Sequence, residues 1–206
     1  MERKVQVALR LTLAAAVLTV GAILTAGTVD AHTGTGLAGG FNAGFLHPLN
    51  GPDHLLAMVA VGLWGAFLGY PLIVALPVIF PAVMAVGGVL GIANVPFPPV
   101  EIGIALSVLL LGAVIAGAFR APAWAACSVV GLFALFHGYA HGQELPSVAD
   151  PIAYSVGFVL ATGMLHVVGI AIGYVRKWPK GTVAVRGLGG LIAAAGFFFL
   201  SNAITQ

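Results

Sequence analysis

Two short histidine-containing motifs hold most of the residues in this chain that could bind a metal ion. The first runs from His47 to His54 and reads HPLNGPDH, and the second runs from His137 to Glu144 and reads HGYAHGQE. Both lie within or beside stretches apolar enough to cross a bilayer, where an ionisable group is costly and needs a polar, aqueous or cationic partner. Imidazole and carboxylate together suit a borderline divalent metal such as nickel, cobalt or zinc. The motifs therefore predict a membrane protein that handles a metal ion.

The first motif combines a helical stripe with a backbone break. Positions seven apart return to nearly the same direction on a helix, so His47 and His54 share one face. Pro52 cannot donate a backbone hydrogen bond, and Gly51 beside it is flexible, so a local break is expected here. Such breaks inside membrane helices often mark ion sites. Asp53 points off the stripe, and it either ligates through the distortion or orients an imidazole ligand by hydrogen bonding to it.

The second motif gathers three candidate ligands within two helical turns. His137 and His141 are four residues apart, and Glu144 follows three residues later, so all three can share a face. Glu101 begins a separate apolar segment that the predicted topology starts on the same side of the membrane. Imidazole or carboxylate groups from three helices are thus expected at one level. The alternative for both motifs is a polar network that only locks the helices together.

Two further histidines each allow two alternative roles. His166 lies about fourteen residues past Ile152, or about 21 Å down its helix at ~1.5 Å per residue. It is either an inner relay position on a path to the cytoplasm or a buried histidine bonded to a neighbouring helix. His32 would begin the mature chain if a signal peptide were removed, and it would then either capture metal or form a polar chain end.

The composition requires that these groups sit in a membrane domain. The 206 residues are 60% hydrophobic and 7% charged, and their mean hydropathy of +1.09 excludes an ordinary soluble domain. We expect an all-α polytopic membrane protein with a signal peptide at residues 1–31 and one transmembrane domain of six helices at residues 32–206. If the signal is retained, the bundle has seven helices. The six segments run roughly from Leu37 to Gly69, Leu72 to Ile92, Val100 to Phe119, Trp124 to His141, Ile152 to Val175 and Val185 to Ala203.

The charges of the connecting segments predict the orientation. Basic residues follow the third and fifth segments, which should place those connections in the cytoplasm. The other two main connections carry acidic residues and should face outward, with both histidine motifs. The net charge of +2 is too small to indicate nucleic acid as a partner.

At these residues the chain resembles the HupE/UreJ family. The family pattern H-P-x-x-G-x-D-H matches the first motif, and F-H-G-x-A-H-G-x-E matches the stretch from Phe136 to Glu144. A third element, A-T-x-x-L-H, matches the stretch from Ala161 to His166. The N-terminal region, typically rich in histidine in the family, keeps only His32. The resemblance implies functional roles for His47, Asp53, His54, Glu101, His141 and Glu144.

The resemblance also implies a multi-pass protein of the bacterial inner membrane, associated with hydrogenase and urease maturation. We expect a permease that takes up Ni²⁺, or Co²⁺, with Zn²⁺ also compatible, and that has no permanently bound cofactor. No Walker A pattern is present, so this chain is not expected to hydrolyse ATP. Expected partners are the divalent metal ion and the lipid bilayer; a homo-oligomer and metalloenzyme maturation proteins remain open.

Three other functions stay as alternatives. Histidines and carboxylates from three helices can hold zinc with an open position for water, as in an intramembrane hydrolase. Axial histidines on two helices can hold haem, although the C-x-x-C-H motif is absent. An assembly factor would bind the metal without moving it.

Overall fold

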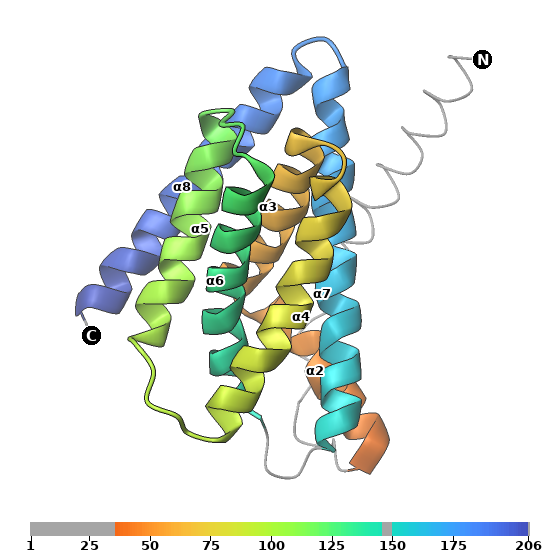
Figure 1. The fold of residues 1–206 in the computed structure, drawn as a ribbon, viewed down its shortest axis with the longest axis vertical. Helices are drawn as coiled ribbons and strands as arrows, with labels where there is room; N and C mark the ends of the chain where they lie inside the picture. Colours follow the sequence, from red (N-terminus) through yellow and green to blue (C-terminus); the bar gives the residue numbers. More distant parts are fainter. Residues whose placement is uncertain (1–35, 146–149, 206) are drawn as a thin grey trace. The chain divides into compact units, whose positions relative to one another are not determined.

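The computed structural model describes residues 36–145 and 150–205. Within these ranges, all of the regular secondary structure is helical (Figure 1). The described elements are α2 (Gly36–Asn50), α3 (Pro52–Leu68), α4 (Leu72–Ile92), α5 (Val100–Ala116), α6 (Ala123–Gln143), α7 (Pro151–Gly173), the short 3-10 helix η2 (Tyr174–Lys177) and α8 (Gly181–Thr205). The all-α polytopic class is therefore confirmed. The predicted signal peptide at residues 1–31 and His32 lie outside the described residues.

Each of the six predicted segments corresponds to helix in the structure. Four stretches are long and apolar enough to cross a bilayer: α4, α6, α8 and α7 continued by η2. The bent pair of α2 and α3 makes a fifth if it is counted as one span. Helix α5 has 17 residues, which is at the lower limit for a spanning helix.

The expected break in the first segment is confirmed. Helices α2 and α3 meet at an angle of 81°, and Gly51 between them has extended backbone angles. Pro52 occupies the first turn of α3, where its missing N–H has no intrahelical role. The break directs the start of α3, with Asp53 and His54, toward the neighbouring helices.

Glycines let neighbouring helices approach until their backbones are in contact. In the α4–α6 pair, a Cβ added at Gly138 would collide with the Met84 carbonyl, and one at Gly87 with the Leu135 carbonyl. Reciprocal glycines of the same kind bring α3 and α7 together, because a Cβ at Gly62 would meet the His166 backbone. Small residues are the usual means by which helices associate in lipid. They hold the second histidine motif of α6 close to α4.

The connections divide by charge between the two ends of the bundle. The α3–α4, α5–α6 and α7–α8 connections lie at one end, and the α4–α5 connection lies at the other (Figure 1). The first end carries Arg120, Arg176 and Lys177, and Arg186 there donates to the Ala116 carbonyl at the end of α5. Glu101 and the start of α7 belong to the opposite end. This distribution matches the predicted alternation.

Candidate metal site

His54, at the start of α3, is held by the residue before it. Asp53 Oδ1 accepts hydrogen bonds from the His54 backbone N–H at 2.7 Å and from His54 Nδ1 at 2.8 Å. Because a carboxylate only accepts, the proton lies on Nδ1 and the lone pair lies on Nε2. His54 Nε2 is buried and has no hydrogen-bond partner in residues 36–145 and 150–205. Asp53 therefore orients His54 so that Nε2 is free to bind a ligand.

His137 is oriented in the same way by a residue that the sequence reasoning missed. Ser107 on α5 donates its hydroxyl proton to the Ile104 carbonyl at 2.6 Å. Its oxygen can then only accept from His137 Nε2, at 2.9 Å. The lone pair of His137 is thereby left on Nδ1, which is fully buried and unpartnered. In the sequence, Ser107 stands out as a polar residue within an apolar helix. The sequence does not show that its partner is His137.

His141 completes a group of three buried histidines, defined here as the inner triad: His54, His137 and His141. One ring nitrogen from each lies within 4.8 Å of the other two. The His54 ring centroid lies 4.7 Å from that of His137 and 4.5 Å from that of His141. Leaving a buried donor or acceptor unpaired costs about 1–3 kcal/mol. Several unpartnered imidazole nitrogens in one place therefore favour a ligand that binds them together, as a divalent metal does.

A second group, the outer group, contains His47, His141 and Glu144, whose candidate ligand atoms also lie within 4.8 Å of one another. His47 Nε2 lies 3.0 Å from Glu144 Oε2, and His141 Nδ1 lies 3.8 Å from the same oxygen. Glu144 caps α6 and is half exposed. The nearby imidazoles of His141 and His47 hold the pKa of Glu144 below its ordinary value. The carboxylate therefore stays charged beside the two imidazoles.

Because His141 belongs to both groups, the candidate ligands form a continuous series from the surface to the interior. The His47 ring lies 4.8 Å from the His141 ring, centroid to centroid, and the inner triad follows directly. His47 is partly exposed, whereas His137 is fully buried. The two motifs that the sequence singled out thus meet in one place.

The remaining predicted residues are not members of either group. Glu101, at the start of α5, lines a separate pocket of about 130 Å³ together with Asp53 and Asn202. His166 is buried deeper in α7, where neither ring nitrogen has a partner. Asp150 caps α7 by accepting from the Ala153 N–H.

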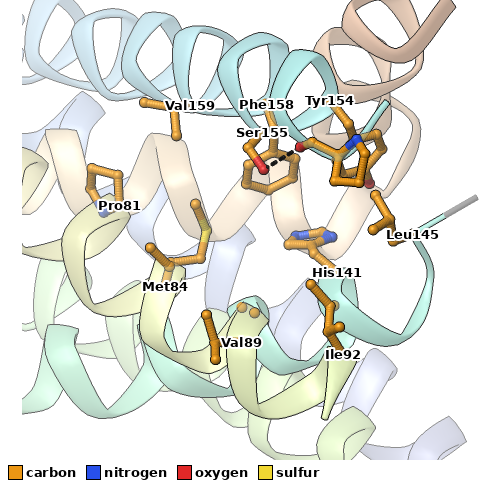
Figure 2. Close-up of a pocket in the computed structure, with 15 residues that line it drawn as sticks. Pro81, Met84, Val89, Ile92, His141, Leu145, Tyr154, Ser155, Phe158 and Val159 are labelled. Atoms are coloured by element: carbon orange, nitrogen blue, oxygen red, sulfur yellow. Dashed lines mark hydrogen bonds between the residues drawn. The ribbon is translucent and has the colours of Figure 1, made fainter. Parts of the chain in front are cut away.

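A larger pocket of about 250 Å³ lies beside His141, between α4, α6 and α7 (Figure 2). It is lined mostly by apolar side chains, with Tyr154 and Ser155 contributing from α7. Ser155 donates to the Pro151 carbonyl, as Figure 2 shows. The Phe158 ring packs on His141 at a centroid distance of 4.2 Å. This side of His141 offers mainly apolar contacts, whereas the side facing His47 is polar.

Ser107→Ala is expected to weaken metal binding by about 10–100-fold, the usual scale for removing a partner that orients a metal ligand. Without the serine oxygen, His137 can carry its proton on Nδ1 and lose the free lone pair. The measurement is nickel affinity of the purified protein by titration calorimetry. Ser201→Ala is the control, because Ser201 donates to the Phe198 carbonyl at an exposed site on α8. Equal affinities of the two variants would contradict this role for Ser107.

The fold and the site define a polytopic α-helical membrane protein with an interior histidine group able to hold a metal ion. The chain belongs to the HupE/UreJ family, since the model described as HupE / UreJ protein matches residues 12–199. It is similar to Protein HupE of Rhizobium leguminosarum bv. viciae, with 47% identity over 167 residues, covering 81% of this chain and 87% of that protein. No solved structure matches the chain. The resemblance stated from the motifs is thereby confirmed.

Proposed function

We propose that this protein is a permease of the bacterial inner membrane that takes up Ni²⁺, or Co²⁺, from the periplasm for hydrogenase or urease maturation. The observation that carries the proposal is the series of histidines from the half-exposed outer group to the buried inner triad. A structural polar network would pair its own nitrogens, whereas these are largely unpartnered. The protein acts as a carrier of the ion and not as an enzyme.

In this mechanism the metal is the substrate, and the outer group meets it first. Glu144 offsets part of its charge, and His47 and His141 replace part of its water shell. The ion then passes to the inner triad, where His54 and His137 supply lone pairs fixed by Asp53 and Ser107. Neutral imidazoles bind a divalent ion without a full set of charged ligands, so release remains fast enough for conduction.

The test is accumulation of radioactive nickel in cells that express the wild type, Asp53→Ala or His54→Ala at matched membrane levels. Uptake should rise with the wild type and collapse in both variants, because His54 supplies a lone pair and Asp53 directs it. Ser201→Ala serves as the exposed control and should transport normally. Cobalt added as a competitor ranks the two ions.

Absence of uptake by the well-expressed wild type would refute the permease. Nickel that is bound by purified protein but not accumulated by cells would instead identify an assembly factor. Bound zinc together with hydrolysis of a lipid or peptide would identify the intramembrane hydrolase.

The contribution of Glu144 to uptake is expected to be the same at a pH of about 7.5 and at a pH of about 5.5. The imidazoles of His141 and His47 hold the pKa of Glu144 below the ordinary carboxyl value, so the carboxylate is ionised throughout this interval. The measurement is the initial rate of nickel uptake by the wild type and by Glu144→Gln, with the membrane potential held constant. The ratio of the two rates should not change over the interval. A ratio that approaches one at the lower pH would show that Glu144 becomes protonated there and would contradict this prediction.

A further inference from the structure

A second polar cluster lies deeper in the bundle, on the face of α7 that carries Thr162 and His166. These two residues are one helical turn apart, and each is at most 1% exposed. Among the described residues, the Thr162 hydroxyl and both ring nitrogens of His166 have no hydrogen-bond partner. Three unpartnered polar atoms so deeply buried are unusual in a native interior.

The backbone of α4 adds an oxygen to this cluster. Pro81 has no N–H, so the carbonyl of Pro77, four residues earlier, has no partner in the helical ladder. That carbonyl approaches the His166 ring. Imidazole, hydroxyl and carbonyl are all neutral ligands for a divalent cation.

Phe80 separates this cluster from the inner triad. Its ring packs on His137 at a centroid distance of 5.5 Å and on His166 at 5.4 Å. Among the described residues, no ring contact joins His137 directly to His166. Phe80 is fully buried and lies between Pro77 and Pro81, where the hydrogen-bond ladder of α4 is weakened. The aromatic ring thus lies between two groups of free ligand atoms.

The geometry points to a second, inner cation site formed by His166 and Thr162, reached from the inner triad past the Phe80 side chain. It takes the same borderline divalent metal as the triad, and this assignment rests on the proposed permease function. The site contains no carboxylate among the described residues around it. Its neutral ligands bind the ion weakly, and an intermediate site on a conduction path must release what it binds.

The test measures two quantities for each variant. One is the rate of radioactive nickel uptake by cells, and the other is equilibrium nickel binding to membranes prepared from the same cells. His166→Ala is expected to lower the uptake rate by about tenfold or more, the scale of losing a metal-contacting group, while binding at the inner triad is retained. Thr162→Val, which has nearly the same shape but no hydroxyl, should also slow uptake, and Thr162→Ser should not. Met164→Ala on the exposed face of α7 is the control for general effects on this helix.

Wild-type uptake rates in both His166→Ala and Thr162→Val would overturn the inner site and leave the permease function standing. A parallel loss of binding and uptake would also overturn it, because the residues would then act through the inner triad. If His166→Ala does not accumulate in membranes, the threonine pair decides, and equal uptake by Thr162→Val and Thr162→Ser overturns the site. A wild type that takes up no nickel refutes the permease itself and the inner site with it.

Discussion

His141→Ala is expected to remove saturable nickel binding and uptake, with a fall in affinity of about 100-fold or more. His141 is the one residue common to the outer group and the inner triad, so its loss leaves each group with two candidate ligands. Within the described part of the chain, neither nitrogen of the His141 ring has a hydrogen-bond partner. The substitution therefore breaks no described hydrogen bond of the ring, and the protein should still fold.

Titration calorimetry on the purified protein and uptake in cells measure these two losses. Gln143→Ala is the matched control, because Gln143 lies two residues away on α6 and is exposed. It donates only to the Tyr139 hydroxyl. An affinity of His141→Ala near that of Gln143→Ala would show that the two groups do not share a ligand.

Gly138→Ala is expected to destabilise the fold strongly. The added methyl group would collide with the Met84 carbonyl, which is backbone and cannot rotate away. Overpacking of this kind costs about 1–3 kcal/mol and sometimes more. Separation of α4 from α6 would also displace His137, the neighbouring residue, so nickel binding should fall together with stability.

Gly163→Ala provides the comparison, because nothing lies within 4 Å of a Cβ built at Gly163 on α7. Alanine is favoured over glycine within a helix by about 1 kcal/mol, so this variant should be as stable as the wild type or more so. Thermal unfolding in detergent, followed by circular dichroism, distinguishes the two. Equal unfolding temperatures for both variants would mean that α4 and α6 are not in backbone contact.

The sequence predicted the helices well, because long apolar runs and turn residues carry that information locally. The break before α3 followed from Pro52, which cannot continue the hydrogen-bond ladder of α2. The sequence allowed Asp53 either to ligate the metal or to orient an imidazole. The hydrogen bond to His54 favours the orienting role. These features depend on residues that are neighbours along the chain.

The contacts between helices were not predictable in the same way. Helical periodicity tells which residues share a face, but not which face of another helix lies opposite. Ser107 and His137 are thirty residues apart, and only the packing of α5 against α6 brings them together. For the same reason, the sequence could place Glu101 at the same end of the bundle as the histidines, but it could not show that Glu101 and Asp53 line one pocket.

Because His141 belongs to both the outer group and the inner triad, the two groups cannot each hold a metal ion at the same time. A neutral imidazole has a single lone-pair nitrogen, so one ring cannot serve an ion in the outer group and another in the inner triad at once. A following ion would have to wait outside until His141 is released. On the proposed function, transport is therefore single-file, and at high external nickel its rate is limited by the departure of the ion ahead.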